Sequence, residues 1–192
     1  CQPSMPKDAE VGIIKGMYCL QKNKQSATAH AQLLGSGTIL RETLAASELL
    51  KSDWKVSTDV WSVTSFTELR RDGLCIDREN MYSSNSPDKA TWVEKCLGST
   101  IGPIIASTDY MRAVPDMIRT WVPRRYVTLG TDGYGRSDTR KSLRDFFEVD
   151  RFHITLATLK ALVAEGSIDK SVLSKALKKY GLKSDRPNPW DI

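Results

Sequence analysis

The chain has 192 residues, a hydrophobic fraction of 40% and a formal net charge of +5, which together predict one globular domain with a sizeable core. Its basic residues are scattered among acidic ones, without the concentrated stripe or recognition motif of a nucleic-acid-binding protein. No apolar run is long enough for a bilayer, no signal peptide opens the chain, and the four irregularly spaced cysteines indicate reduced thiols rather than a disulfide framework.

Residues 1–8 are expected to be an extended connector, because Pro3 and Pro6 disfavour a helix. The chain begins with Cys1 instead of methionine, so we interpret it as a domain cut from a longer protein at a linker. The first helix is expected at 9–20 and is followed by a polar turn at 23–26.

Hydrophobic periodicity then predicts alternating strands and helices as far as residue 180. Strands are expected at 28–34, 59–64, 103–107 and 126–129. Helices are expected at 38–52, from Phe66 to a stop near Gly73, at 91–97, from Pro115 to Trp121, from Leu143 to Glu148, after Asp150 as far as Gly166, and from Val172 to Tyr180. This alternation predicts an α/β fold with three layers, α/β/α, around a mostly parallel sheet. The domain covers 9–184, and 185–192 form an extended tail.

The stretch Gly130–Arg140, GTDGYGRSDTR, is predicted to be a turn from a strand into a helix. Its glycines give the backbone freedom, and Ser137 or Asp138 can cap the following helix. Such turns lie at the carboxyl edge of a parallel sheet, where open α/β folds place ligands or partner contacts. Asp109, Asp132 and Asp138 should gather there beside Arg136 and Arg140. Pairing between these carboxylates and guanidinium groups is favoured over acid–base catalysis.

Five further blocks occur in the order in which a known family has them. They are Gln32–Gly37, Ser62–Leu69, Ala106–Met111, Phe147–Asp150 and Gly166–Lys170. With the turn, these blocks resemble the C-terminal domain of the transketolase superfamily, and within it the bacterial homodimeric pyruvate dehydrogenases. The resemblance covers nearly the whole chain. It implies a transketolase C-terminal-domain-like architecture in which one strand can be antiparallel, although the sequence does not say which.

The resemblance also implies a function for the longer protein. Such an enzyme is a cytoplasmic bacterial oxidoreductase that decarboxylates pyruvate on thiamine diphosphate and magnesium, and then acetylates the lipoyl group of a dihydrolipoyl acyltransferase. The superfamily holds its cofactor with a GDG…NN motif, which this sequence lacks because no Asn pair follows Gly130–Gly133. The family's activating glutamate and substrate histidines belong to its other two domains. We therefore expect no catalytic, cofactor-binding or metal-binding residue in this chain, and no activity of the chain alone.

The partners implied by the resemblance are the other domains of the same chain, the second subunit of a homodimer and the acyltransferase. The turn is expected to contact another domain or the second subunit, or to border the approach to the active site. The residues expected to do so are Asp132, Gly133, Tyr134, Arg136, Ser137 and Asp138.

Two alternatives remain open from the residues alone. The turn Gly35-Ser36-Gly37 could make the chain a free-standing module that binds a small anion at the start of a helix. It lacks the full dinucleotide fingerprint, since Leu40 stands at the position of the third glycine. The chain could instead be a docking domain for a partner protein. His30 and His153 show no metal-ligand spacing with the cysteines.

Overall fold

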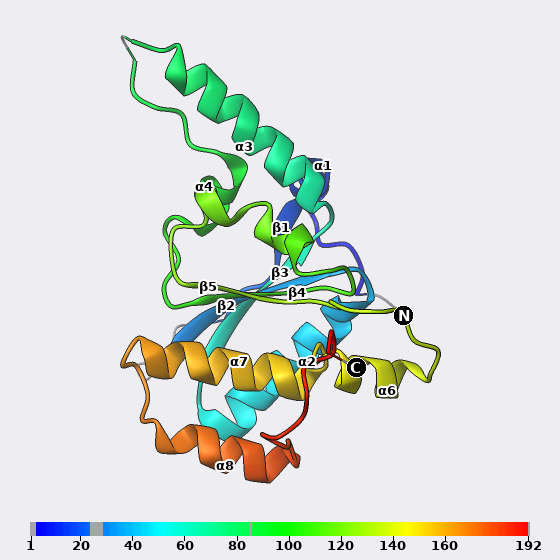
Figure 1. Cartoon of the computed structure of the whole chain (residues 1–192). Helices are drawn as coiled ribbons and strands as arrows, with labels where there is room; N and C mark the ends of the chain where they lie inside the picture. The colour runs from blue at the N-terminus through cyan, green and yellow to red at the C-terminus, as the bar shows by residue number, and fades with distance from the viewer. Residues whose placement is uncertain (1–2, 24–28, 85, 192) are drawn as a thin grey trace.

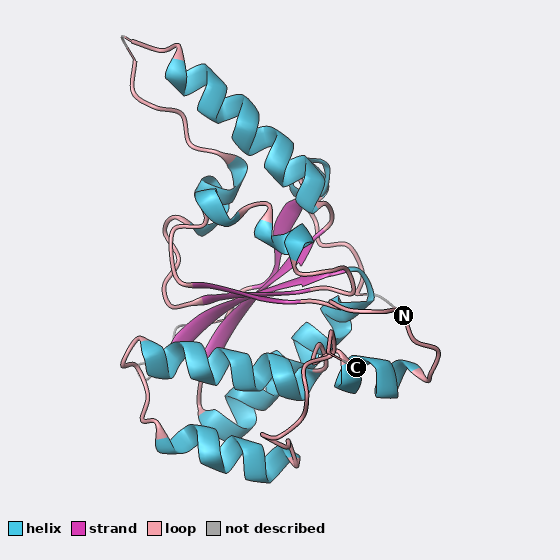
Figure 2. Cartoon of the chain, in the orientation of Figure 1, coloured by secondary structure: helices cyan, strands magenta, loops and turns pink. Residues whose placement is uncertain are grey.

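The computed structural model describes residues 3–23, 29–84 and 86–191, and in them a five-stranded sheet lies between two layers of helices (Figures 1 and 2). The strand order is β1-β3-β2-β4-β5. The strands are β1 Met17–Gln21, β2 His30–Ser36, β3 Ser57–Val63, β4 Ile104–Ser107 and β5 Tyr126–Leu129. All pairs are parallel except β1 with β3. The predicted three-layer α/β fold with a mostly parallel sheet is therefore confirmed.

The antiparallel strand β1 replaces the second half of the helix expected at 9–20. That helix, α1, covers only Glu10–Lys15 and ends at Gly16, whose φ is +101°. A side chain at Gly16 would be strained at this φ, and its Cβ would lie 2.6 Å from the carbonyl oxygen of Ser65. The expectation was wrong because the reversal at Gly16 sends the chain into an edge strand that completes the sheet beside β3.

One face of the sheet is covered by α2, Leu40–Trp54, and α7, Arg151–Ala164, with α8, Ser171–Tyr180, packed outside them (Figure 1). The short α6, Arg140–Phe146, follows the predicted turn. The core on this side contains aliphatic residues from β2, α2 and α7, including Leu33, Leu50 and Leu159. The phenol of Tyr180 in α8 donates to Asp53 Oδ2 in α2 over 2.9 Å and so links these two helices.

The other face carries α1, α3 Phe66–Met81, α4 Trp92–Leu97 and α5 Ala113–Asp116 (Figure 1). Short 3₁₀ turns occupy Gly37–Ile39 and Arg119–Trp121. A second core fills the space beneath these helices and includes Met17, Leu34, Leu69, Leu97 and Ile118. No helix in the described ranges combines the length and the apolar composition that a membrane crossing requires.

The helix that was expected to stop near Gly73 continues to Met81 and projects from the body as an arm (Figure 1). Gly73 is buried beneath the indole of Trp121, and a Cβ there would lie 2.5 Å from the ring. The indole Nε1 also donates to Asp77 one turn further along, at 3.0 Å. Gly73 therefore permits a close contact between elements and does not end the helix.

Caps were predicted for the first turns of α7 and α6, and only the one for α7 is confirmed. Asp150 caps α7 as predicted, because its carboxylate accepts from the backbone N–H groups of Phe152 and His153. The predicted cap of α6 was wrong, since Thr139, rather than Ser137 or Asp138, accepts from the N–H of Ser142.

Two other differences concern the limits of elements. The helix expected from Pro115 to Trp121 is reduced to the four residues of α5 and the following 3₁₀ turn. The polar turn expected at 23–26 and the start of the first strand at 28 lie largely outside the described residues.

The connections fix where a site can form. From β2 the chain passes through α2 to β3 on one side, whereas β4 lies on the other side of β2. The direction of winding therefore changes between β2 and β4, and their carboxyl ends form the crevice that open α/β folds use for ligands.

Candidate functional site

The two strands at the reversal are joined by a side-chain hydrogen bond. The hydroxyl of Thr38, just after β2, donates to Asp109 Oδ2, just after β4, over 3.1 Å. Asp109 Oδ1 would lie 3.1 Å from a Cβ at Gly37, whose φ is +55°. The carboxylate thus occupies the space beside the glycine-rich turn in which an anion would have to bind.

This position argues against the anion-binding alternative at Gly35-Ser36-Gly37. A Cβ at Gly35 would lie 2.7 Å from Thr43 Oγ1 in α2. Gly35 is therefore required for close packing between strand and helix, and the carboxylate of Asp109 would repel an anion at Gly37.

The turn Gly130–Arg140 follows β5 at the same edge of the sheet. A Cβ at Gly130 would lie 2.6 Å from the carbonyl oxygen of Tyr110. Gly133 has a φ of +107°, and a Cβ there would lie 2.8 Å from the carbonyl oxygen of Pro189. Two glycines are thus required by the geometry, while a Cβ at Gly135 would meet nothing within 4 Å.

The acids of the turn do not pair with the predicted arginines. Asp132 accepts from the backbone N–H of Arg112 over 2.9 Å, and its Oδ2 lies 3.5 Å from Arg112 Nε. Asp138 Oδ1 accepts from the backbone N–H of Thr139 over 2.6 Å. Arg136 lies over the ring of Phe146, 4.1 Å from its centroid. Asp132 therefore lies beside an arginine, as predicted, but this arginine is Arg112 and not Arg136 or Arg140.

A cavity of about 440 Å³ opens between this turn, the reversal and α6. It is lined by Thr38, Ile39, Asp109, Thr131, Gly133, Tyr134, Gly135, Arg136, Arg140, Leu143, Arg144, Phe147 and Val149. We call it the switch-point cavity. Of the six residues predicted for the turn, Gly133, Tyr134 and Arg136 line it. Ser137 and Asp138 line a smaller neighbouring hollow with Arg136.

A buried carboxylate behind the cavity joins three elements. Glu42 of α2, with 7% of its side chain exposed, accepts from Arg144 of α6 over 2.8 Å and from Arg151 of α7 over 2.9 Å. Burial alone would raise the pKa of Glu42, but the hydrogen bonds and charge of Arg151, followed by the charge of Arg144, lower it below its usual value. This group fixes α6, and with it one wall of the cavity.

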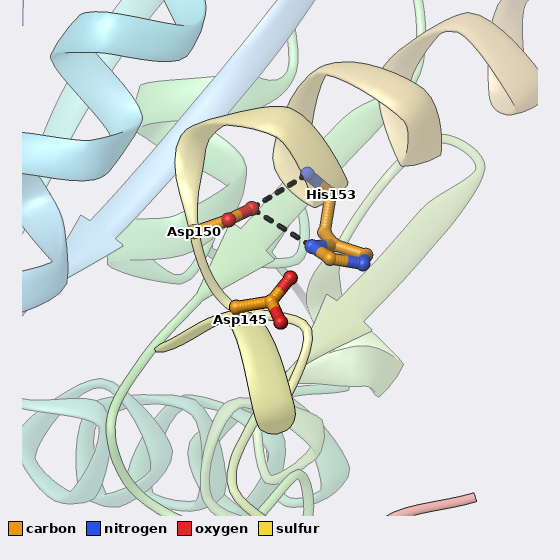
Figure 3. A group of neighbouring side chains, drawn as sticks. All are labelled: Asp145, Asp150 and His153. Atoms are coloured by element: carbon orange, nitrogen blue, oxygen red, sulfur yellow. Dashed lines mark hydrogen bonds and ion pairs between the residues drawn. The ribbon is translucent and has the colours of Figure 1, made fainter. Parts of the chain in front are cut away.

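Asp145, Asp150 and His153 form the one group of potential metal ligands among the described residues, and Figure 3 shows their side chains together. Asp150 Oδ1 lies 2.8 Å from His153 Nδ1 and also caps α7. Asp145 is paired with Arg186 at 3.0 Å. These side chains therefore already have protein partners, and we assign no cation to them; the expectation of no metal site stays a prediction.

The Asp150–His153 contact changes the chemistry of the carboxyl. Burial would raise the pKa of Asp150, but the hydrogen bonds from the side chain and backbone of His153 lower it overall. The other histidine, His30, lies in β2 with its Nε2 3.1 Å from Asp59 Oδ2, inside the protein.

Sequence reasoning missed Thr38, Glu42, Arg112 and Arg144. Thr38 and Arg112 could have been suggested by their positions just beyond strands, since parallel strands bring such residues to one edge. Glu42 had no comparable signal, because its partner Arg144 lies 102 residues away in the sequence.

In a comparison with known proteins, residues 16–150 match the family model of the transketolase-like C-terminal domain. The chain is 54% identical over 191 residues to the pyruvate dehydrogenase E1 component of Pseudomonas aeruginosa, covering 99% of this chain and 22% of that protein. It is 44% identical over 188 residues to the same component of Escherichia coli K12, covering 97% of this chain and 21% of that protein. The chain thus spans about a fifth of the length of these relatives.

Solved structures agree in fold. A transketolase from Pichia stipitis superposes with a TM-score of 0.56 at 15% identity, covering 87% of this chain and 21% of that one. A split-gene transketolase superposes with a TM-score of 0.54 at 15% identity, covering 78% of this chain and 43% of that one. At such low identity the likeness concerns the fold alone.

Proposed function

The chain belongs to the family of transketolase-like C-terminal domains, and we propose from this premise that it is the C-terminal domain of a bacterial pyruvate dehydrogenase E1 component. The observation that carries the proposal is the 54% identity over 99% of the chain to the Pseudomonas aeruginosa protein. The whole enzyme would decarboxylate pyruvate and acetylate the lipoyl group of a dihydrolipoyl acyltransferase, working as a homodimer in the cytoplasm.

Thiamine diphosphate and magnesium would be bound by other parts of that enzyme. The switch-point cavity is a poor site for the magnesium ion, because Asp109 is the one carboxylate among the residues that line it and already accepts from Thr38. The three arginines of the cavity would also repel the cation. We therefore assign no step of the reaction to residues of this chain.

We assign the chain a structural role, in which the turn Gly130–Arg140 contacts another domain or the second subunit. Tyr134 supports this role because 82% of its surface is exposed, on a turn whose backbone is fixed by Gly130 and Gly133. Tyrosine and arginine are enriched among the residues that dominate binding energy at protein interfaces. Arg136 stands beside Tyr134 in the wall of the same cavity.

A truncation and a charge reversal in the turn test this role. In the full-length enzyme, Tyr134→Ala and Arg136→Glu should weaken the dimer and lower activity, measured by analytical ultracentrifugation and pyruvate turnover. Arg78→Glu, a reversal on the projecting arm, is the control. Unchanged dimer dissociation and activity in both turn variants would contradict the role.

The wider assignment has its own test. Deleting this domain from the full-length enzyme should abolish stable assembly or activity, and the chain alone should not turn over pyruvate or bind thiamine diphosphate tightly. Turnover by the isolated chain would refute the assignment. Retention of the chain on the immobilised acyltransferase core would instead favour the docking alternative.

A further inference from the structure

We propose that the switch-point cavity binds a small organic anion, a carboxylate or phosphate that carries an apolar or aromatic body and a hydroxyl or amino donor. The proposal goes beyond the structural role above and requires that the turn's contact with another domain leaves the cavity open. It rests on the shape, charge and unused polar groups of the cavity.

The position and size of the cavity are those of a ligand site. It opens beside the carboxyl ends of β2 and β4, where the direction of winding reverses. Its volume of about 440 Å³ lies within the usual range for small-molecule sites. A Cβ at Gly130 or Gly133 would clash with the backbone of Tyr110 or Pro189, so the backbone path of the turn beside the cavity requires both glycines.

The charges of the lining select an anion. Arg136, Arg140 and Arg144 contribute three guanidinium groups, opposed within the lining by Asp109 alone. Arg144 is engaged by Glu42. The guanidinium group of Arg140, in contrast, has no hydrogen bond or ion pair with any residue that the structure describes, and that of Arg136 has only its contact with the ring of Phe146. Two guanidinium groups therefore remain able to bind a carboxylate or phosphate.

The remaining lining determines the rest of the ligand. Ile39, Phe147 and Val149 are buried core residues that form the apolar floor, while the exposed ring of Tyr134 stands at the rim. This combination suits a flat or apolar body. Asp109 uses Oδ2 to accept from Thr38, and Oδ1 accepts no hydrogen bond from the described residues. A hydroxyl or amino group of the ligand would satisfy it.

Titration calorimetry on the chain, with small probes that differ in one feature, tests the proposal. The probes are 4-hydroxyphenylacetate, phenylacetate, phenyl phosphate, inorganic phosphate and tyramine, the last being a cation of similar shape. We expect saturable binding of at least one aromatic anion, weaker binding of inorganic phosphate, and none of tyramine. 4-Hydroxyphenylacetate should bind more tightly than phenylacetate because its hydroxyl supplies a donor for Asp109 Oδ1. Comparing carboxylate with phosphate identifies the preferred acid.

Two variants locate the binding. Arg140→Gln should weaken the preferred anion about tenfold, the effect of losing one charge-assisted contact. Arg70→Gln removes an exposed positive charge from α3, on the other face of the sheet, and should change affinity less than about twofold. Circular dichroism should show that both variants are folded.

Three results would overturn the proposal. The first is no saturable binding of either aromatic anion up to millimolar concentration. The second is equal weakening by Arg140→Gln and Arg70→Gln, which would indicate nonspecific attraction to a basic protein. The third is binding to the isolated chain but not to the full-length enzyme, which would mean that another part of the protein fills the cavity. None of these results would affect the dimer and turnover measurements that test the structural role.

Discussion

The indole of Trp121 lies directly against the backbone of Gly73, so closely that a Cβ on the glycine would stand 2.5 Å from the ring. The contact joins the middle of α3 to the 3₁₀ turn before β5. It allows the indole Nε1 to reach Asp77. This pair of residues therefore holds the arm against the body of the domain.

Gly73→Ala should destabilise the protein although alanine favours helices. The clash should cost about 1–3 kcal/mol, while the better helix propensity returns at most about 1 kcal/mol. We expect a net loss of about 1–2 kcal/mol in the free energy of unfolding, measured by urea titration. Gly135→Ala, where a Cβ meets nothing within 4 Å, should be close to neutral. A Gly73→Ala protein as stable as the parent would show that the indole moves away without cost.

Glu42→Gln should be destabilising in a pH-dependent manner. The variant leaves Arg144 and Arg151 without their carboxylate, at a cost of about 2–3 kcal/mol near neutral pH; this is less than for a fully buried pair because Arg151 is half exposed. The pKa of Glu42 is lowered in the folded protein, so its contribution is present above its unfolded value of 4.5 and is lost as the pH falls through the folded value.

The difference in unfolding free energy between parent and Glu42→Gln should therefore shrink on acidification below about pH 4.5. Urea titrations at several pH values measure it. Glu48→Gln, at an exposed position on the same helix, provides the matched control and should change stability little. A gap that stays constant down to the acid transition would disprove the linkage.

Asp150→Ala should destabilise α7 by removing its cap. The carboxylate accepts from two backbone N–H groups and contacts the His153 ring, and loss of a cap of this kind costs about 1–2 kcal/mol. Asp150→Ser keeps a capping oxygen and should recover most of the loss. Thermal unfolding of both variants measures the effect, and equal melting temperatures for Ala and Ser would rule out capping as the source.

The cysteines should differ in their rates of alkylation. Burial raises the pKa of the Cys96 thiol to about 11, from an ordinary value of 9.0, which leaves about a hundredfold less thiolate at neutral pH. Cys75 is exposed on α3. Iodoacetamide labelling followed by peptide mass spectrometry should modify Cys75 well before Cys96. Comparable rates at the two positions would mean that the region around Cys96 opens readily.

The sequence was sufficient where the controlling contacts are local. The apolar run of β4, the cap at Asp150 and the end of α8 at Gly181 each depend on residues within a few positions. Gly16 and Gly73 show the limit of such signals. Gly16 ends a helix that was expected to continue, whereas Gly73 lies inside one that was expected to stop, because of an indole 48 residues away in the sequence.

The same limit applies to the site. Parallel topology allowed the turn Gly130–Arg140 to be placed at the carboxyl edge of the sheet, and half of its predicted residues line the cavity. The partners were not predictable in this way. Asp132 pairs with Arg112 rather than with a neighbour in the turn, and Glu42 joins helices that lie far apart in the sequence. Such ion pairs form only when whole helices pack against one another, so the neighbouring sequence does not indicate them.

The buried residues of the arm lie at only one of its ends, while its far end has exposed contacts between Asn80 or Glu79 and Lys89. The buried residues of α3 are Phe66, Leu69 and Gly73, all in its first half, while Met81 and Tyr82 at the far end are exposed. A helix that packs against the core at one end unfolds locally most readily at its other end. Within a single helix, amide protons near Phe66 should therefore exchange with solvent on the slow timescale of the domain as a whole. Those near Met81 should exchange far sooner, so that a single helix contains both slowly and rapidly exchanging amide protons.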